Sequence, residues 1–444
     1  MNTNAFRLLA LTIAMYLGAW TFNIRLLFYL AYVMTAVMIG SWIWARLNLT
    51  GLDARRDARQ HQVQVGDTFE EVFTVRNGIP VPKLWLEVRD HSTLPGHQAA
   101  AVISLAGGKA KRWRVRTYCR RRGRYKLGPL VLISGDPFGL FRSWRTVPDM
   151  AELLVFPPVV DLTAFGVPLS DLPGGLQVRR RTQSSTPNAV GLRDYLPGDS
   201  FNRIHWPATA RRQQLTVKEF ELDPTADVWI VLDLDRDVHV ALPRALADPS
   251  KTPPLPRSRL LGTRPHPGGT WVHLEDEEPP VRLDPSTEEY AVTVAASIAA
   301  HFLQQDRAVG LIASGNRPVV LPPDRGGRQL IKVLRELAVA RADEPLSLAE
   351  LLTGEAQHFS RSDTLVVVTP ATDEGWVAAL AHVRRRGVQA TAVLIDPGTF
   401  GSSRDPMLVV GALATADVPS YLIKRDDALD VALHTPHYSS RPLR

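Results

Sequence analysis

The stretch Val228-Trp-Ile-Val-Leu-Asp-Leu-Asp-Arg-Asp237 decides the fold class of the larger part of this chain. Its first five residues are apolar without interruption, which is typical of a strand buried on both faces of a parallel sheet. Acidic residues follow at alternate positions, at Asp233, Asp235 and Asp237, and we call these three the acidic rim. Because ligands of open α/β sheets collect at the carboxyl ends of the strands, the acidic rim is a candidate site.

Downstream of this strand, helical and strand patterns alternate to the end of the sequence. Ser286 and Glu289 have the spacing of a capping box, which predicts a helix over Thr287 to Gln305. The further predicted elements are a strand at 308–313, a helix at 328–340, a strand at 364–369, a helix at 374–386, a strand at 389–395 and a strand near Tyr421. This order predicts a doubly wound α/β domain over 227–444, with an extended Pro-rich insertion at 240–285.

Period-two alternation dominates residues 61–150. Runs such as Phe69-Glu-Glu-Val-Phe-Thr-Val75, with Gly and Pro between them, predict about seven antiparallel strands, the size of an immunoglobulin-like β-sandwich. The run Arg120-Arg-Arg-Gly-Arg124 predicts either solvated charges beside an edge strand or a contact with phosphate or anionic lipid. Cys119 is the single cysteine, and we expect a buried structural thiol there.

The first 48 residues are strongly apolar. Two apolar runs, 8–22 and 26–45, are broken only by Thr21-Phe-Asn-Ile-Arg25, and their apolar residues circle every helical face instead of forming a stripe. The second run has about the 20 residues that a membrane span requires, whereas the first is shorter. We therefore predict a transmembrane hairpin over 1–48 and a basic linker over 49–60.

The charge pattern beside the hairpin predicts its orientation. Arg46, Arg55, Arg56 and Arg59 follow the second apolar run, so the positive-inside rule places the soluble domains in the cytoplasm. Arg7 before the first run is consistent with both ends of the hairpin on that side.

Composition and motifs exclude several classes of function. The net charge of +7 comes without zinc spacing or a basic helix interleaved with aromatic residues, so we do not expect nucleic-acid binding. Attraction to an anionic membrane surface accounts for the charge equally well. The first α/β strand is followed by no Walker-type or dinucleotide glycine motif, and Gly-x-Ser-x-Gly is missing, so we expect neither ATP binding nor a serine hydrolase.

The acidic rim is also a candidate cation site. Carboxylates at alternate positions can bind a hard divalent cation through oxygen. Arg236 lies among them, however, and Pro370 ends the strand at 364–369 where a further acidic ligand would be useful. We therefore expect no cofactor and keep a divalent cation as the alternative.

The connecting segment, 151–226, contains the densest motif of the chain, Gly191-Leu-Arg-Asp-Tyr-Leu-Pro-Gly-Asp-Ser-Phe-Asn-Arg-Ile-His-Trp-Pro-Ala-Thr-Ala-Arg-Arg212, here called the signature segment. It combines a turn, a helix-capping residue, arginines that bind carboxylates or carbonyls, and aromatic anchors. The residues that we expect to act there are Arg193, Tyr195, Pro197, Gly198, Asp199, Arg203, Trp206 and Arg211. His205 is expected to be a hydrogen-bonded structural histidine.

The signature segment resembles the bacterial family called domain of unknown function 58. The resemblance rests on Arg193-Asp-Tyr-Leu-Pro-Gly-Asp199, Arg203-Ile-His-Trp206 and Ala210-Arg211. Two upstream runs, Gly123-Arg-Tyr-Lys-Leu-Gly-Pro129 and Gly135-Asp-Pro-Phe-Gly-Leu-Phe141, are similar to that family as well. The resemblance implies an α/β domain like the von Willebrand factor A domain and an association with MoxR-type AAA+ ATPases.

The resemblance carries over only part of a metal site. Von Willebrand A domains typically hold a cation with Asp-x-Ser-x-Ser, a distant Thr and a distant Asp. Asp233 matches the first ligand, whereas Asp235 and Asp237 stand where the serines would be, and the distant Thr is not identifiable. Metal-dependent adhesion is therefore not what the sequence favours.

Taken together, the sequence predicts a membrane-anchored scaffold or adaptor, and not an enzyme, in the inner (cell) membrane of a bacterium. It would bind a MoxR-type AAA+ ATPase or its client through the A-like domain. The signature segment would either brace the β domain against the α/β domain or bind the partner itself. The alternatives are a metal-dependent hydrolase at Asp233 and a binder of membrane-surface or cell-envelope polyanions through Arg120–Arg124 and Arg179–Arg181.

Overall fold

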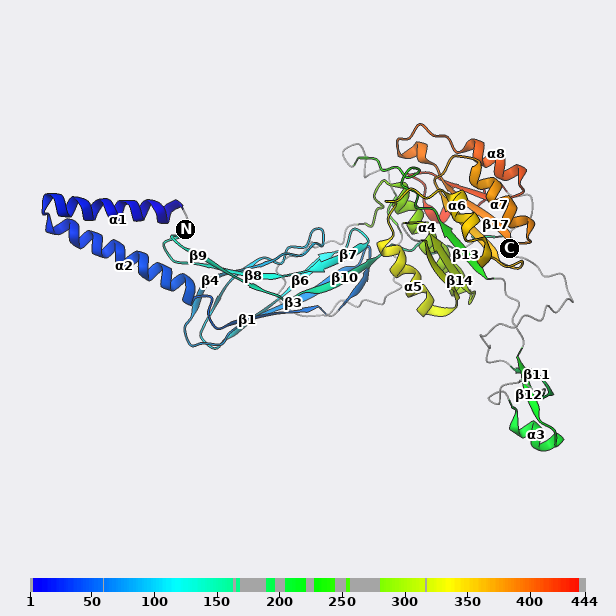
Figure 1. Ribbon diagram of the computed structural model, residues 1–444, viewed down its shortest axis with the longest axis horizontal. Coiled ribbons are helices and arrows are strands. Elements are labelled where there is room, and N and C mark those ends of the chain that lie inside the picture. Colours follow the sequence, from blue (N-terminus) through cyan, green and yellow to red (C-terminus); the bar gives the residue numbers. More distant parts are fainter. Residues whose placement is uncertain are drawn as a thin grey trace.

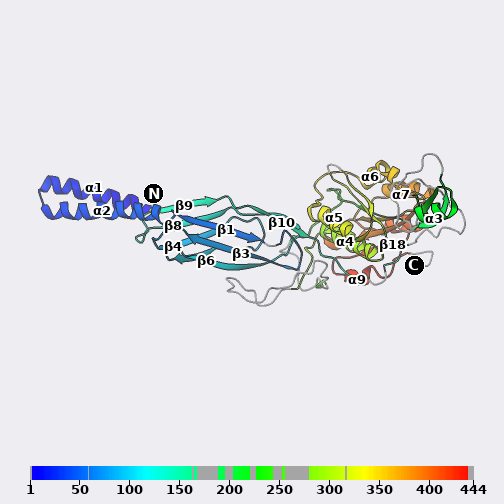
Figure 2. The same cartoon turned by 90° about the horizontal axis from the view of Figure 1, so that it is seen from below.

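The computed structural model describes residues 3–58, 60–162, 165–167, 189–195, 204–220, 227–243, 253–255, 280–315 and 318–438. They form an elongated molecule, with a helical hairpin at one end, a β domain in the middle and an α/β domain at the other end (Figures 1 and 2).

The N-terminal hairpin consists of α1 (Thr3–Phe22) and α2 (Arg25–Leu47). Asn23 turns the chain with a φ of 50°, and the Tyr16 hydroxyl lies 3.2 Å from the Thr35 hydroxyl across the two helices. Large apolar side chains face outward, for example Trp20, which is 79% exposed. Both helices are long and apolar enough to cross a bilayer, which confirms the predicted pair of apolar helices and suggests a membrane anchor.

The basic linker predicted over 49–60 is wrong, because the chain enters the β domain without a break. Leu49 is buried in the core of the β domain, and β1 (Leu52–Ala58) pairs with β3 (Thr68–Asn77). The Asn48 side-chain amide donates to the Leu84 carbonyl at 2.6 Å and to the Ser134 hydroxyl at 2.5 Å. The Lys83 ammonium donates to the Leu47 carbonyl, the kind of contact that caps a helix C-terminus.

The β domain is a sandwich of mainly antiparallel strands, as predicted. Its remaining strands are β2 (Gln62–Gln64), β4 (Lys83–Asp90), β5 (Ala101–Leu105), β6 (Ala110–Tyr118), β7 (Gly123–Leu127), β8 (Leu130–Gly135), β9 (Arg142–Val147) and β10 (Ala151–Phe156). The sheets β1-β3-β6 and β5-β4-β8-β9 enclose one apolar core, and the sheet β2-β10-β7 covers a second. The domain therefore runs from β1 to β10, beyond both predicted boundaries, 61 and 150.

The α/β domain is doubly wound, as predicted. Its strands are β13 (Val228–Leu232), β14 (Val309–Ala313), β15 (Val319–Asp324), β16 (Thr364–Thr369), β17 (Gln389–Ile395) and β18 (Ser420–Ile423), in the order β15-β14-β13-β16-β17-β18. All neighbours are parallel except β15, which pairs antiparallel with β14. The strand order reverses beside β13, so the carboxyl end of β13 lies at the switch point where open sheets bind ligands.

Helices cover both faces of this sheet (Figure 1). They are α4 (Thr287–Gln304), α5 (Gly326–Val339), α6 (Leu348–Gly354), α7 (Gly375–Arg385), α8 (Met407–Thr415) and α9 (Leu429–Ala432). Residues 157–162 and 165–167, predicted as part of a connecting segment, pack into the core on the α4 side instead. There the Val160 amide donates to the Ser297 hydroxyl at 2.9 Å.

Three details differ from the sequence-based expectations. The predicted capping box is wrong, since the Ser286 side chain makes no capping hydrogen bond and Glu289 accepts from Arg122 of the β domain instead. The edge strand β15 and the helices α6, α8 and α9 were not predicted. The Pro-rich insertion lies mostly outside the described residues, but its base is closed by a hydrogen bond of 2.8 Å from the Leu242 amide to the Pro285 carbonyl.

Candidate functional site

The acidic rim is held closed by its own hydrogen bonds. The Asp233 carboxylate is fully buried and accepts from the Thr369 hydroxyl at 2.6 Å and from the Asp235 amide at 3.0 Å. The Asp235 carboxylate in turn accepts from the Asp237 amide at 3.0 Å. Asp237 itself is exposed and lies 3.6 Å from the Arg236 guanidinium. Two of the three carboxylates therefore shape the loop after β13.

Burial dominates the electrostatics of this loop. It raises the pKa of Asp233 from 3.8 to about 7, against the hydrogen bonds from Thr369 and Asp235. The His239 ring lies 2.9 Å from the Asp233 carbonyl through Nε2 and 3.0 Å from the Thr287 hydroxyl through Nδ1. A carbonyl only accepts, so Nε2 carries the proton, and burial lowers the pKa of His239. The site at neutral pH is thus a neutral histidine beside a carboxyl group close to its pKa.

A buried arginine joins the β domain to the α/β domain. The Arg122 side chain is 4% exposed, and its guanidinium donates to Glu288 at 2.6 Å and to Glu289 at 3.1 Å. It also donates to the Leu337 and Ala340 carbonyls, at 3.1 and 2.8 Å. These partners are the first turn of α4 and the end of α5, so Arg122 satisfies carbonyls that a helix C-terminus leaves unpaired. We call Arg122 with its four partners the interdomain clamp.

The interdomain clamp and the acidic rim share two segments. Thr287, which contacts His239, immediately precedes the clamp residue Glu288 at the start of α4. The second segment follows α5: the Ala342 amide lies 3.3 Å from Glu288, and the Arg236 amide donates to the Glu344 carbonyl at 3.0 Å. A displacement of the loop after β13 would therefore reach the clamp through rigid backbone.

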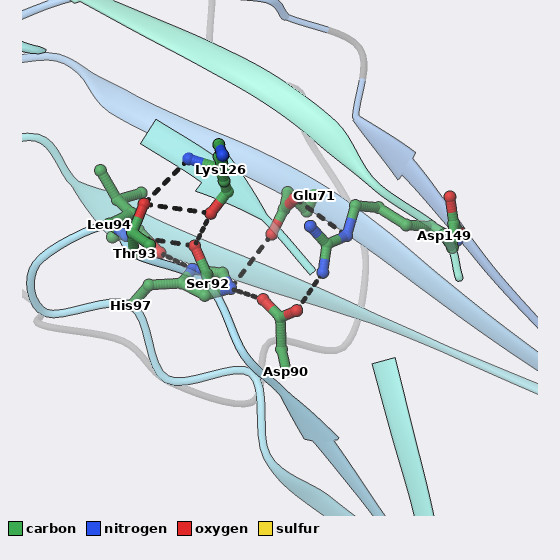
Figure 3. A network of polar contacts seen from close by, with 10 residues as sticks. Glu71, Asp90, Ser92, Thr93, Leu94, His97, Lys126 and Asp149 are labelled. Atoms are coloured by element: carbon green, nitrogen blue, oxygen red, sulfur yellow. Dashed lines mark hydrogen bonds and ion pairs between the residues drawn. The ribbon is translucent and has the colours of Figure 1, made fainter. Parts of the chain in front are cut away.

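The interior of the β domain holds a second buried charge cluster, which we call the ion quartet: Arg56, Glu71, Asp90 and His97. Figure 3 shows the His97 ring pointing at the carboxylates of Glu71 and Asp90, with Nε2 at 3.2 and 2.9 Å. Arg56 donates to Asp90 and lies 3.4 Å from Glu71. Each of the four side chains is at most 1% exposed.

The two carboxyl groups of the ion quartet have pKa values shifted in opposite directions. Burial raises the pKa of Glu71, whereas at Asp90 the hydrogen bond from His97 and the charge of Arg56 together outweigh burial and lower the pKa. Glu71, Asp90 and His97 offer ligand atoms within 4.8 Å of one another, a spacing that suits a metal ion. The guanidinium of Arg56 already supplies a cation to the same two carboxylates, so the arrangement favours an ion-pair network.

The described part of the signature segment forms a small unit of its own. β11 (Ala189–Asp194) pairs antiparallel with β12 (Thr216–Phe220), and α3 (Trp206–Arg212) lies between them in sequence. His205 caps α3 by accepting from the Ala208 amide at 3.1 Å, which confirms its structural role. Trp206 is 63% exposed, and Arg211, in the last turn of α3, is exposed as well.

The predicted signature residues are only partly placed. The Tyr195 amide donates to the Leu215 carbonyl at 2.7 Å, and Arg193 lies opposite Val217 in the β11–β12 pair. Pro197, Gly198, Asp199 and Arg203 lie outside the described residues.

Among the described residues, the ion pairs between the β domain and the α/β domain come from outside the signature segment. The unit of β11, α3 and β12 lies away from the β domain in both views (Figures 1 and 2). Among the described residues Arg121, 2.8 Å from Asp284, and Arg122 make the ion pairs between the domains. The run Arg120–Arg124 is thus in part an interdomain contact, whereas Arg179–Arg181 lie outside the described residues.

Several functional residues were missed at the sequence level. Inward alternation of Phe69, Glu71 and Phe73 on β3 is a signal that Glu71 is buried, and a buried carboxylate requires a cation. Thr369 ends the strand beside Asp233, where an acidic residue was sought and Pro370 was found instead. Cys119 is buried with its pKa raised to about 12 by burial, which confirms the expected structural thiol.

Comparisons with known proteins agree with the signature segment. The family model described as "Protein of unknown function DUF58" matches residues 191–239, from β11 to the loop after β13. The "Uncharacterized protein YeaD" of Bacillus subtilis (strain 168) is 22% identical over 335 residues, which cover 72% of this chain and 70% of that protein. Together these matches confirm the predicted resemblance and support assignment of the chain to the DUF58 family.

Similarity to solved structures is local. The CARDB domain of the PF1109 protein from Pyrococcus furiosus matches 24% of this chain and 94% of its own, at 13% identity and a TM-score of 0.19. Proximal thread matrix protein 1 from the mussel byssus matches 47% of this chain and 46% of its own, at 8% identity and a TM-score of 0.29.

Replacing the arginine of the ion quartet tests whether the quartet holds the β domain together. Arg56→Gln leaves two buried carboxylates with one cation fewer, so the free energy of unfolding should fall by about 3–5 kcal/mol. The neighbouring Arg55 is 79% exposed, and Arg55→Gln should change it by less than about 0.5 kcal/mol. Urea unfolding of the full chain in detergent micelles measures both, and equal effects would contradict the structural role of Arg56.

The interdomain clamp is tested in the same way. Arg122→Ala removes the cation that pairs with Glu288 and Glu289 in the described part of the chain, and the Leu337 and Ala340 carbonyls lose their guanidinium donor. We expect a loss of about 3–5 kcal/mol and two separated thermal transitions in calorimetry. Arg124→Ala, on the exposed side of β7, is the matched control and should keep the wild-type profile.

The pH dependence of stability tests the buried carboxyl group of the rim. Because the pKa of Asp233 is higher folded than unfolded, the folded state binds more protons between about pH 4 and 7. As the pH rises across that window, this group should therefore lower the free energy of unfolding by about 1.4 kcal/mol for each pH unit. Asp233→Asn should remove this slope from calorimetric melts at about pH 4–7, whereas the exposed-site variant Asp237→Asn should retain it.

Proposed function

Starting from the assignment of the chain to the DUF58 family, we propose that this protein is a membrane-anchored scaffold or adaptor. Its α/β domain is von Willebrand A-like and faces the cytoplasm of a bacterial cell. Its partner is a MoxR-type AAA+ ATPase or the client of such an ATPase. The protein positions this partner at the membrane and performs no catalysis itself.

The strand order of the α/β domain supports the A-like assignment. The sheet has the doubly wound order β15-β14-β13-β16-β17-β18, with the central strand β13 leading directly to Asp233. The first ligand position of an A domain is thus at the switch point of the sheet. Thr369, from the neighbouring strand β16, contacts this carboxylate at 2.6 Å.

The observation that carries the scaffold proposal is the closed state of the acidic rim. Asp233 is fully buried and its two carboxylate oxygens each accept a hydrogen bond from the protein. A general base or a metal ligand needs a carboxylate oxygen that the substrate or ion can reach, whereas the Asp233 side chain is buried. The loop after β13 is therefore better suited to present a shaped surface than to perform hydrolysis at Asp233.

The signature segment supports a docking role. The stretch matched by the family model runs from β11 through the exposed Trp206 to His239. Partially exposed tryptophan and arginine are the residue types that dominate the binding energy of protein interfaces. Since the interdomain contact is made by Arg121 and Arg122, Trp206 and Arg211 are free to act as the partner-binding surface.

The helical hairpin supports a topology in which the N-terminus and the soluble domains lie on the same side of the membrane. The two helices are antiparallel, so Thr3 and Leu47 lie at the same end (Figure 1). Arg56 is buried in the ion quartet and does not face the membrane surface. The exposed arginines that favour a cytoplasmic orientation are Arg7, Arg46 and Arg55.

The proposal is tested with the full chain in lipid nanodiscs and a purified MoxR-type AAA+ ATPase of the source organism. Wild type should bind in biolayer interferometry, and Trp206→Ala should weaken binding at least about tenfold, the effect of losing an interface anchor. Met150→Ala, at a 69% exposed residue of the β domain, is the control and should bind within about twofold of wild type. Absence of wild-type binding would contradict the partner, and equal affinity of the two variants would contradict docking through Trp206.

A further inference from the structure

One end of the β domain carries large apolar side chains that no part of the described chain covers. They are Leu84, Trp85, Phe138 and Trp144, which are 50%, 71%, 67% and 72% exposed, and we call them the aromatic end. Soluble surfaces rarely gather such residues without a partner.

The strand register brings these residues together. Leu86, which follows Trp85 on β4, pairs with Ser134 on β8, and Trp144 on β9 pairs with Ile133. Neighbouring strands lie about 4.8 Å apart, so Trp85 and Trp144 flank the end of β8 at a separation of about 10 Å. Phe138 lies in the turn between β8 and β9.

Hydrogen bonds and packing hold the turn that carries Phe138 in one conformation. The buried Asp136 carboxylate accepts from the Phe138 amide at 2.9 Å and from the Phe141 amide at 2.6 Å. Leu140 is 7% exposed and holds the other side of the turn inside the domain. These contacts fix the backbone, so that Phe138 projects outward in a defined position. The run Gly135–Phe141, noted in the sequence, thus has a structural purpose apart from the α/β domain.

The aromatic end lies where the helical hairpin meets the β domain. Asn48, directly after α2, donates to the Leu84 carbonyl and to the Ser134 hydroxyl, so α2 ends on the same strands. In both views β9 begins beside the N-terminal end of α1 (Figures 1 and 2). The plane in which the helices leave the hydrocarbon therefore passes this end of the domain.

The charges at this level fit lipid headgroups. Arg7 near the start of α1, Arg46 near the end of α2 and Arg142 at the start of β9 are all exposed. The Arg46 guanidinium lies 4.6 Å from the Trp42 ring centroid, a cation–π pair of the kind found at a membrane interface. Aromatic rings and cations together are the composition of the belts that proteins place at the bilayer surface.

We propose that the aromatic end docks onto the bilayer, with Phe138, Trp85 and Trp144 in the headgroup region of the leaflet from which α1 and α2 emerge. This inference rests on the membrane anchoring in the proposed function. The β domain then contacts the lipid surface directly and has a fixed orientation to it, instead of moving on a flexible linker. The α/β domain is held at the height of the β domain above the membrane.

The experiment uses the full chain in liposomes of phosphatidylcholine and phosphatidylglycerol. Phe138→Cys is labelled with an environment-sensitive fluorophore, since the native Cys119 is buried with a raised pKa and does not react in the folded protein. Lipids with a nitroxide either near the headgroup or deep in the acyl chain then quench the label. Leu17→Cys, on the outward face of α1, reports anchoring.

Met150→Cys is the matched control. Residue 150 is 69% exposed but follows the far end of β9, because Val147 pairs with Leu130 at the opposite end of β8. At about 3.4 Å per residue, it lies about 20 Å farther from the bilayer than the start of β9.

We expect the label introduced by Phe138→Cys to lose at least about half of its fluorescence with the shallow nitroxide, and clearly less with the deep one. The Met150→Cys label should lose almost none. If the Leu17→Cys label is quenched but the label at position 138 behaves like the one at position 150, the docking is wrong while the anchor stands. If the Leu17→Cys label is not quenched either, the membrane anchor itself is refuted.

Discussion

The need to partner every buried guanidinium is the constraint on which this architecture depends. A charge removed from water must be paired and hydrogen-bonded, otherwise the group destabilises the folded state by several kcal/mol. Arg56 meets this condition inside the β domain through Glu71 and Asp90. Arg122 meets it only across the domain boundary, with Glu288, Glu289 and the end of α5. Together with the exposed Arg121–Asp284 ion pair, this buried side chain therefore fixes the contact between the two domains.

The start of α4 connects the interdomain clamp to the loop of the acidic rim. The start of α4 contacts Arg122 through Glu288 and His239 through Thr287. The closed hydrogen-bond set around Asp233 makes this loop rigid, because each donor and acceptor in it fixes a neighbour. A partner bound near the carboxyl end of β13 would thus be held in a defined orientation relative to the β domain.

At the other end of the molecule, the junction between the helical hairpin and the β domain is also held by direct contacts. α2 passes into the β domain through Asn48, Leu49 and the Lys83 contact, without a linker. The chain from α2 to β13 therefore contains two stiff junctions, one at each end of the β domain. Such a molecule transmits the orientation of its membrane segment to its α/β domain, which is a useful property for a scaffold.

The sequence by itself determined what depends on local pattern. Periodicity gave the two apolar helices, the β-sandwich and the alternation from Val228 to Tyr421, because the 3.6- and 2-residue periods and turn residues act over short distances. Local cues also identified His205 and Cys119 correctly. The tertiary structure decided which charges meet. The sequence places Arg56 and Arg122 in two runs of exposed-looking basic residues. Their partners Glu71 and Glu288 follow 15 and 166 residues later, beyond the reach of any local pattern. Only the packing of sheets and helices excludes water from these groups and makes their pairing obligatory.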